Sequence, residues 1–529
     1  MVSDPDLDRR GFLRQGLKLG ILAAGALATA GLAEGCANES APPSTTSTLA
    51  LGPPTASQWA AFARSLDGSL VRPSNGAYEL DRLLYNSKFA DPRPMALAYC
   101  ASADDVARSV DFANRHAIRV AARSGGHSYG GYSSCDGLVI DVSRLASITV
   151  DRSANVATVG AGAQLIDVYN VVGAHDRLLP GGSCPTVGIA GLALGGGIGV
   201  FARRYGLTCD NLQALDLVSA DGERVRADAH QHSDLLWACR GGGGGNFGVA
   251  TSFQFTVHPM PEVALFSVQY PWPAAAAMLQ AWQHWIAATP DELWSNCLLL
   301  CEGTAGYLAQ VSGVFCGSTQ RLSGLLDGLT KAVATAPSAR FVGSNDYISA
   351  MQIEAGCSGL TIAACHMSTQ GHGGTLGREA YSAKSSYVDG PMDESRTLSM
   401  VEAVQHLKDL APTIGGGLAF DAYGGAINRV AADATAFVHR DKLACIQATY
   451  SWAAVTPPSV VATGAQWLGW LGANVFDRSS GAYQNYIDPT LQDWPSAYYG
   501  QNLKRLTKVK RAYDPEDVFR FKQSIPRAR

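Results

Sequence analysis

The stretches SGGHSYGG (residues 124–131), GGSCPTVGIAGLALGGGIG (residues 181–199) and GGGGGNFG (residues 241–248) hold much of the excess glycine of this chain, which has 57 glycines among 529 residues. Glycine at this density costs conformational entropy, and it persists where the backbone takes positive φ angles or approaches a ligand closely. Each stretch lies between predicted apolar strands and helices. We therefore interpret the three stretches as a backbone cradle for a phosphate-bearing ligand rather than as flexible linkers.

Familiar glycine motifs fit these stretches poorly. The G-x-G-x-x-G match at residues 243–248 follows a predicted helix and precedes a predicted strand, which is the reverse of the Rossmann order. No G-x-x-x-x-G-K-[ST] stretch exists, so P-loop chemistry is excluded. The G-x-S-x-G pattern at residues 126–130 makes Ser128 an alternative hydrolase nucleophile. A hydrolase elbow starts a helix at once, whereas this one leads into a predicted strand.

The composition restricts the number of domains and the partners. The length predicts about two or three domains with a large buried core. The chain carries 41 basic and 45 acidic residues, and charged residues make up only 16% of it, so it lacks the basic surface that nucleic-acid binding requires. Beyond the N-terminal region no apolar run reaches the ~20 residues of a membrane-spanning helix. The sequence therefore predicts no nucleic-acid partner and no transmembrane helix.

The N-terminal region is typical of an export signal. The pair Arg9-Arg10 precedes an apolar stretch at residues 19–33, which is too short for a comfortable membrane span. This order predicts a twin-arginine signal over residues 1–35 and a Ser/Thr/Pro-rich linker over residues 36–55. Because Cys36 directly follows the apolar stretch, a lipid anchor at this cysteine and simple cleavage with release both stay open.

The cysteines predict disulfides rather than a metal site. An exported chain with twelve cysteines can form disulfides, but one sequence does not reveal their pairing. No C-x-x-C pair, no H-E-x-x-H helix and no Cys/His spacing suited to zinc occurs. We therefore predict no metal.

The predicted elements mix short helices and strands and indicate the α+β class. Helices are predicted over residues 102–113 (capped by Ser102), 165–172, 233–238, 274–287 and 503–511, and strands over 118–122, 138–142, 156–159, 213–219, 223–226, 251–257 and 307–315. Asp221-Gly222 separates two of these strands, which is a strong hairpin signal. The basic residues of the last helix are interpreted as a solvated face; they are Lys504, Arg505, Lys508, Lys510 and Arg511.

Several motifs occur in a fixed order along the chain. They are RSGGHSYGG (123–131), GSCPTVG (182–188), GGNFG (244–248), YQNYID (483–488), YYGQN (498–502), YDPEDVF (513–519) and QSI (523–525). Together they resemble the berberine bridge enzyme-like flavoprotein oxidases over about residues 56–526. The resemblance implies a PCMH-type (vanillyl-alcohol-oxidase-like) fold. Its FAD-binding domain would span residues 56–260, its α+β substrate domain 261–475, and a C-terminal segment 476–529 would return to the FAD domain.

The resemblance implies FAD held at two covalent points, through His127 to the 8α carbon and through Cys184 to C6 of the flavin ring. From the residues alone, a buried hydrogen-bonding histidine and a buried free thiol would be the default interpretation. The positions that match the family's cofactor-binding residues are Arg123, Ser124, Gly125, Gly126, His127, Ser128, Gly130, Gly182, Cys184, Val187, Gly188, Gly191, Gly195, Gly196, Gly197, Gly199, Gly248, Tyr483 and Asn485.

The catalytic positions also follow from the resemblance. Tyr486 matches the family's catalytic tyrosine, which is neutral near pH 7 unless a cation or hydrogen-bond donors stabilise its phenolate. In some relatives a lysine two residues before a glutamine does so; here Gln447 matches the glutamine, but Cys445 occupies the lysine position. The Tyr486 phenolate must therefore be stabilised in another way than by this lysine. Asp421 and Tyr423 resemble the segment that supplies a second polar group above the flavin.

Two further positions concern the substrate and the electron acceptor. Relatives that act on sugars often carry a tyrosine where this chain has Ile198, so the resemblance supports a sugar substrate less firmly. Val187 matches the position that governs oxygen access to the flavin in relatives, and valine there favours oxidase behaviour. The resemblance thus predicts dioxygen as acceptor and hydrogen peroxide as product.

The leading hypothesis is an exported FAD-dependent oxidase that acts on a hydroxyl group of a small molecule, either a sugar or a secondary metabolite. The alternative within the same chemistry is an FAD-dependent dehydrogenase that uses an acceptor other than oxygen. Alternatives from other classes are a serine hydrolase at Ser128 and a non-catalytic flavin-binding or cell-envelope protein.

Overall fold

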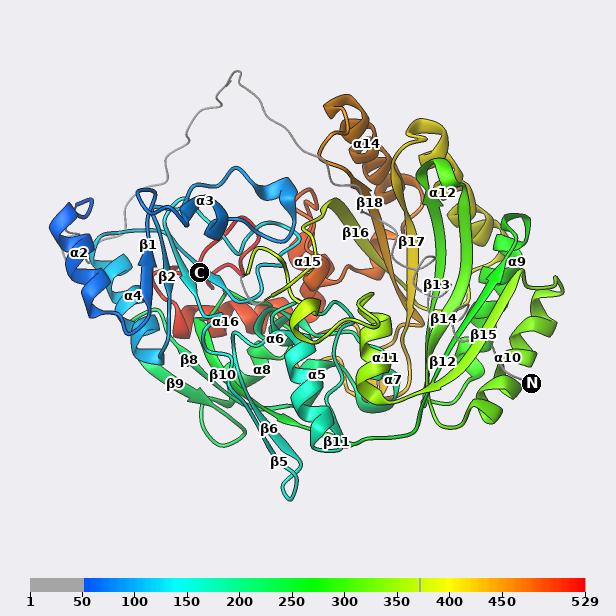
Figure 1. Ribbon diagram of the computed structural model, residues 1–529, viewed down its shortest axis with the longest axis horizontal. Coiled ribbons are helices and arrows are strands. Elements are labelled where there is room, and N and C mark those ends of the chain that lie inside the picture. The colour runs from blue at the N-terminus through cyan, green and yellow to red at the C-terminus, as the bar shows by residue number, and fades with distance from the viewer. Residues whose placement is uncertain (1–51, 371–372, 529) are drawn as a thin grey trace.

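A computed structural model describes residues 52–370 and 373–528 (Figure 1). The predicted export signal over residues 1–35, Cys36 and most of the predicted linker lie outside the described residues. Within the described part, the chain forms sheets of four, five, two and seven strands surrounded by helices. This mixture confirms the predicted α+β class. Among the described residues no helix is long and apolar enough to cross a membrane.

A four-stranded sheet opens the described chain. Its order is β1 (Ser69–Val71), β2 (Ala96–Tyr99), β4 (Leu138–Asp141) and β3 (Val120–Arg123). β2, β4 and β3 run parallel, and the four residues of β4 are all buried. Helices α2 (Ala56–Ser65) and α4 (Ala103–Arg115) pack together beside this sheet. The predicted cap is present, because the Ser102 side chain accepts a hydrogen bond from the Asp105 backbone nitrogen.

A five-stranded antiparallel sheet follows. Its order is β5 (Ile148–Asp151), β6 (Val156–Gly160), β10 (Val249–Thr256), β8 (Leu212–Val218) and β9 (Arg224–Ala227). The predicted hairpin is confirmed between β8 and β9, where Gly222 takes a positive φ of 83°. The helices of this region are α5 (Leu165–Ala174), α6 (Ile189–Gly195), α7 (Ala202–Tyr205) and α8 (Ser233–Cys239). β7 (Arg177–Leu178) pairs with β11 (His258–Pro259).

A seven-stranded antiparallel sheet forms the other half of the molecule. Its order is β15 (Ala339–Asn345), β12 (Val263–Tyr270), β14 (Tyr307–Cys316), β13 (Leu293–Glu302), β17 (Gly415–Ala422), β18 (Ala444–Trp452) and β16 (Ala380–Val388). Figure 1 shows four helices on its outer face: α9 (Ala275–Ala288), α10 (Thr319–Val333), α12 (Glu394–Leu410) and α14 (Pro458–Asn474). The apolar faces of these helices bury residues such as Trp282 and Trp467. The opposite face of the sheet is therefore the one that looks toward the N-terminal half.

Helix α11 (Tyr347–Glu354) lies on that inner side and contacts α5 of the N-terminal half (Figure 1). It is followed by the disulfide Cys357–Cys365, a pairing that the sequence left open. The other nine cysteines within the described residues are free thiols.

The C-terminal segment returns to the N-terminal half through α15 (Trp494–Tyr499) and α16 (Leu503–Tyr513), and α16 contacts α8 (Figure 1). The prediction of a solvated basic face on α16 is wrong for Lys510. Its side chain is fully buried, and its ammonium donates to the Asp514 carboxylate and to the Asn246 and Phe519 carbonyls. A charge needs such partners when it leaves water, so Lys510 fastens the C-terminal segment to the loop around Asn246.

Candidate functional site

A cavity of about 490 Å³ lies between the N-terminal half and the inner face of the seven-stranded sheet. Most of the predicted site residues line it. They are Arg123, Ser124, Gly125, Gly126, His127, Ser128, Gly182, Cys184, Val187, Gly188, Gly191, Gly199, Gly248, Asp421, Gln447, Tyr483, Asn485 and Tyr486. Residues more than 300 positions apart in the chain thus face one space.

The glycine-rich wall is built by close approach of two backbones. A Cβ atom on Gly125 would overlap the Gly188 backbone nitrogen, and a Cβ on Gly188 would overlap the Gly125 nitrogen and the Ser124 hydroxyl. Only glycine therefore allows the loops around His127 and Cys184 to meet. A Cβ on Gly191 would instead meet no heavy atom within 4 Å, so this glycine faces open space on the cavity side.

Four of the predicted cofactor-binding glycines, Gly130, Gly195, Gly196 and Gly197, do not line the cavity. Gly130 lies next to the Tyr132 ring. Gly195, Gly196 and Gly197 form the turn that ends α6, where Gly196 and Gly197 have φ angles of 134° and 89°. The backbone nitrogen of Gly197 donates to Tyr483 Oη at 2.8 Å. These three glycines therefore hold the wall in place from behind.

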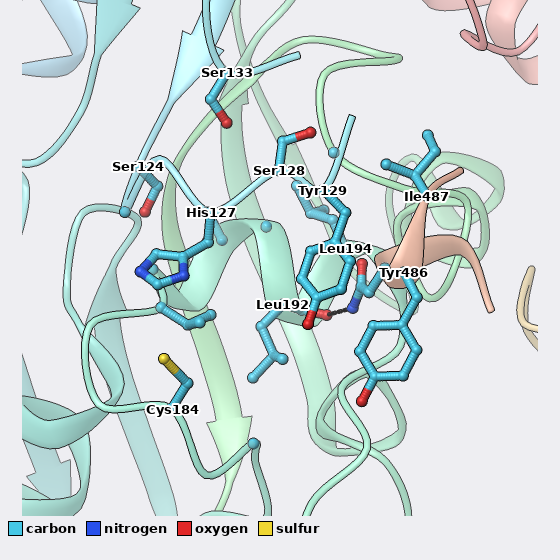
Figure 2. A pocket seen from close by; sticks show the side chains of 18 of the residues that line it. Ser124, His127, Ser128, Tyr129, Ser133, Cys184, Leu192, Leu194, Tyr486 and Ile487 are labelled. Carbon is cyan, nitrogen blue, oxygen red and sulfur yellow. Dashed lines mark hydrogen bonds between the residues drawn. The ribbon is translucent and has the colours of Figure 1, made fainter. Parts of the chain in front are cut away.

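His127 and Cys184 share a neighbour. Thr186 Oγ1 lies 2.9 Å from His127 Nε2 and 4.0 Å from Cys184 Sγ, and Figure 2 shows the sulfur directed toward the imidazole. The Tyr85 ring stacks on the His127 ring with centroids 4.0 Å apart. Burial lowers the pKa of His127 to about 3 and raises the pKa of Cys184 to about 11. At neutral pH the pair is a neutral imidazole and a protonated thiol.

The aromatic side of the cavity centres on Tyr486. Its ring stacks on Tyr129 with centroids 5.2 Å apart (Figure 2). It also makes a T-shaped contact with the Tyr483 ring, with centroids 4.9 Å apart. The Gln447 side chain donates from Nε2 to Tyr129 Oη at 2.8 Å, and Asn485 Nδ2 donates to Tyr483 Oη at 2.9 Å. Tyr129 is not among the predicted site residues, although it lies within the SGGHSYGG stretch.

The third wall is a polar patch on the seven-stranded sheet. Strand pairing places Ser312, Asn296 and Asp421 side by side in one row, followed by Cys445. The next row on the same face contains Gln310, Leu298, Ala419 and Gln447. Because successive side chains of a strand alternate between faces, residues two apart share the cavity side. Asn296, Gln310 and Ser312 were not predicted, because their proximity depends on strand register that the sequence did not reveal.

Asp421 is the residue of this patch with a raised carboxyl pKa. Its position inside the cavity, away from bulk water, raises its pKa to about 7, and a hydrogen bond with the Tyr486 hydroxyl partly opposes this shift. Burial and the charge of Asp421 in turn raise the pKa of Tyr486 above its ordinary value. Burial also raises the pKa of Cys445, so it is a neutral thiol and supplies no positive charge to the tyrosine. Tyr486 is therefore a neutral phenol beside a carboxyl group that titrates near neutrality.

Glu354 supplies a second carboxyl group to the cavity and is not among the residues predicted from the sequence. It is the last residue of α11 and lines the same space as Asp421. Burial, and then the charge of Asp421, raise its pKa to about 7. A single glutamate in a segment without a motif gives no signal in the sequence, so only its place in the fold reveals it.

Tyr423 does not line the cavity, so the structure does not bring it together with Asp421, Gln447 and Tyr486. Its side chain is buried among Tyr387, Cys445 and Tyr483, and its hydroxyl lies 3.3 Å from Tyr387 Oη. The strand β17 ends at Ala422, so the period of two that brings Asp421 to the cavity does not extend to Tyr423.

Ser128 lacks the surroundings of a hydrolase nucleophile. Its hydroxyl accepts a hydrogen bond from the Tyr132 backbone nitrogen at 3.1 Å, and the nearby His127 directs Nε2 to Thr186 instead. No helix starts after it, since a turn leads on to β4. Within the described residues no group of three or more His, Cys, Asp or Glu side chains is placed to hold a metal ion.

The chain matches two protein-family models. One is described as an FAD binding domain and matches residues 94–228, and the other is described as berberine and berberine like and matches residues 482–526. The first match contains His127 and Cys184, and the second contains Tyr486. His127, Cys184 and Tyr486 thus belong to two separate family matches, and all three line one cavity.

Curated proteins and solved structures agree with these matches. An uncharacterised FAD-linked oxidoreductase of Bacillus subtilis, YgaK, is 32% identical over 466 residues, which cover 87% of this chain and 97% of the relative. Glucooligosaccharide oxidase of Sarocladium strictum is 29% identical over 84% of this chain and 89% of the relative. The structure of Physcomitrella patens BBE-like 1 superimposes with a TM-score of 0.80 at 29% identity, over 89% of this chain and 99% of that one. This likeness confirms the predicted PCMH-type fold.

Proposed function

Because the chain belongs to the berberine bridge enzyme-like family of FAD-linked oxidoreductases, we propose that it oxidises a hydroxyl group of a sugar or secondary metabolite, with FAD bound covalently at two points and dioxygen as the electron acceptor. The observation that carries this proposal is that Tyr486 and Asp421 line one cavity whose other wall consists of the glycine loops. Glucooligosaccharide oxidase, one of the similar proteins, is by its name an oxidase of an oligosaccharide.

The cavity fits FAD. The open space beside Gly191 leaves room for a ligand against the backbone. Three lining residues have a buried polar atom without a hydrogen-bond partner in the described structure, namely Tyr132 Oη, Ser134 Oγ and Gln484 Oε1, and a polar ligand would satisfy them. When bound, FAD would supply the hydride acceptor for the reaction.

His127 and Cys184 are the residues that would bond to the flavin. Both line the cavity, and their shared neighbour Thr186 sets them close together. The low pKa of His127 supports this role, because a neutral imidazole keeps the lone pair that a covalent bond requires. The Cys184 thiol must lose its proton before it can bond.

The protein's own part in the reaction is to remove a proton. As hydride leaves the substrate carbon, the substrate hydroxyl gives its proton to the Tyr486 oxygen, and Tyr486 passes its own proton to the Asp421 carboxylate. The alcohol becomes a carbonyl, and the proton ends on Asp421. Position 445 is a neutral cysteine rather than a lysine, so no cation at this position helps Tyr486 to release its proton. In the proposed path the Asp421 carboxylate, with a pKa of about 7, takes up that proton instead.

Dioxygen as acceptor is proposed because Val187 lines the cavity at the position that the family resemblance connects with oxygen access. The alternative is a dehydrogenase that uses another acceptor. Anaerobic reduction of the protein with substrate, followed by mixing with oxygen, separates the two. Rapid reoxidation with one hydrogen peroxide per flavin supports the oxidase, and slow reoxidation that only a quinone or dye accelerates supports the dehydrogenase.

We also propose export through the twin-arginine pathway and leave the lipid anchor at Cys36 as an alternative to release. The Cys357–Cys365 disulfide agrees with folding in, or transfer to, an oxidising compartment. Replacement of Arg9 and Arg10 by lysine tests the route, since it would retain the protein in the cytoplasm. A mass increase on the mature N-terminal peptide tests the anchor.

The first experiment is the visible spectrum and intact mass of the acid-denatured protein. A flavin spectrum that stays with the polypeptide, with the added mass of one FAD, would support covalent attachment. Flavin in the supernatant would leave a non-covalent oxidoreductase, and release of peroxide from hydroxylated substrates would then still test the oxidase.

A further inference from the structure

Glu354 is a carboxyl group in the cavity that the proposed reaction does not use. It is half-buried at the end of α11, and within the described residues no hydrogen bond or ion pair to its side chain is present. A carboxyl group that lines a cavity without a partner from the protein can accept hydrogen bonds from a ligand. Glu354 is therefore a candidate ligand-binding residue of this cavity.

The surroundings of α11 hold Glu354 in place. Asp346 caps the start of the helix by accepting from the Ser349 backbone nitrogen at 2.9 Å. The buried Tyr347 ring meets Tyr169 of α5 edge to face, with centroids 6.1 Å apart. At the other end, Ala355 and the Cys357–Cys365 disulfide pack against Ile166 of α5. Helix α11 is thus held at both ends, so the backbone that carries Glu354 loses little conformational entropy when a ligand binds.

The charges near Glu354 are of one sign. Asp421 is the charged neighbour that acts on its pKa. The arginines that line the cavity are Arg119, Arg123 and Arg520, and they belong to the N-terminal half and the C-terminal segment rather than to α11 or the sheet. Arg123 is already paired with Asp141. A cation beside Glu354 and Asp421 would relieve their repulsion, whereas an anion would add to it.

The neighbouring sheet wall carries uncharged side chains that can form hydrogen bonds with a ligand. The Asn296 carbonyl oxygen Oδ1 accepts from Ser312 Oγ at 2.6 Å, which leaves the Asn296 amide nitrogen for a ligand. Strand register places Asn296 directly beside Asp421. This wall therefore suits a ligand that carries hydroxyl groups as well as a positive charge.

We propose that Glu354 is a specificity-determining residue that binds a protonated amino group of the substrate, so that the enzyme prefers an amino sugar or a similar polyhydroxylated amine. This inference rests on the proposed oxidase function, since the same substrate must present a hydroxyl group to Tyr486. Glu354 would accept hydrogen bonds from the ammonium group, and Asn296 would bind a substrate hydroxyl. Uronic acids and other anionic sugars would be poor substrates.

The test compares the holoenzyme with three disaccharide probes at neutral pH: glucosamine disaccharide, its N-acetylated counterpart and cellobiose. Flavin reduction under anaerobic conditions gives the rate, and the change in the flavin absorption spectrum gives the dissociation constant. The wild type should bind the free amine at least about tenfold more tightly than the N-acetylated form, because charge-assisted hydrogen bonds are strong.

The variants separate the role of Glu354 from general damage. Glu354→Gln keeps the size of the side chain and should reduce the preference for the amine by at least about tenfold. Cellobiose, which carries no amino group, should still bind to this variant and reduce its flavin. Glu354→Asp keeps the charge and should retain part of the preference. Glu402→Gln removes an exposed carboxylate on the outer helix α12 and should change nothing.

The outcomes distinguish this inference from the proposed function. If cellobiose reduces the flavin and the amine has no advantage, or if Glu354→Gln keeps the advantage, the Glu354 assignment is wrong while the oxidase stands. If no sugar reduces the flavin but the amine alone perturbs its spectrum in a Glu354-dependent manner, the binding role stands and the proposed reaction fails.

Discussion

The two principal walls of the cavity are built in opposite ways. The N-terminal wall depends on what is missing, because the absence of a Cβ at Gly125 and Gly188 lets two loops meet. The sheet wall depends on what is present, because Asn296, Asp421 and Gln447 reach the cavity from three strands in register. The first wall suits a large cofactor held against the backbone, and the second presents the side chains that can distinguish substrates. Substitutions in the first wall should therefore impair cofactor binding, and substitutions in the second wall should impair the reaction with the substrate.

The largest effect is expected for the double variant His127→Ala, Cys184→Ala in the glycine wall. It should lose all covalent flavin, because both proposed bonding atoms are removed while the glycine contacts remain. Intact mass after acid denaturation measures this loss. Retention of FAD through precipitation would refute the assignment, and each single variant, which should keep one bond, is the control.

Next in size is Asp421→Asn in the sheet wall. The amide keeps the shape of the side chain but takes up no proton from Tyr486, so flavin reduction should slow by about 10²-fold or more. Stopped-flow absorbance measures the rate, and flavin content should stay normal because Asp421 belongs to the other wall. Tyr486→Phe should show a loss of the same order. A rate near that of the wild type in either variant would remove that residue from the proton path.

A matched pair of glycine substitutions probes the loop wall more finely. Gly188→Ala forces its new methyl group into the Gly125 backbone, and overpacking of this kind costs about 1–3 kcal/mol of the free energy of unfolding. Gly191→Ala has room for the methyl group and lies in α6, so it should not lower stability. It should still lower flavin content, because the methyl group projects into the space proposed for the cofactor. Chemical denaturation and flavin absorbance check both parts, and equal stability of the two variants would contradict the packing argument.

The smallest effect is the pH dependence of flavin reduction. The pKa of Asp421 is raised to about 7, so the carboxylate that accepts the proton forms only as the pH rises through that value. The rate should therefore increase with pH up to a plateau, by about tenfold per unit on the acidic side. Glu354 interacts with Asp421, so the two titrate as a pair, and the measured midpoint belongs to both. Glu354→Gln should move the midpoint to lower pH, whereas a flat profile in the wild type would contradict Asp421 as acceptor.

Local elements of the fold followed well from the sequence, because their signals are local. The helix after Ser102 and the hairpin at Asp221-Gly222 are each set by residues within a few positions. Lys510 shows the limit of such reasoning. A basic helix face is usually solvated, and only the packing of α16 under Asn246 and Phe519 turned this lysine inward.

By itself, the sequence determined the glycine loops with His127 and Cys184, the tyrosine at 486, and through their order the family resemblance, because these motifs are contiguous runs of residues. Only the tertiary structure decided that Asp421 faces the cavity while Tyr423 does not, that Cys357 pairs with Cys365, and that Glu354 joins Asp421 across more than sixty residues of chain. The physical reason is the range of the interactions. Backbone conformation is encoded in neighbouring residues, whereas strand register and the electrostatics of a closed cavity arise only when distant segments pack together.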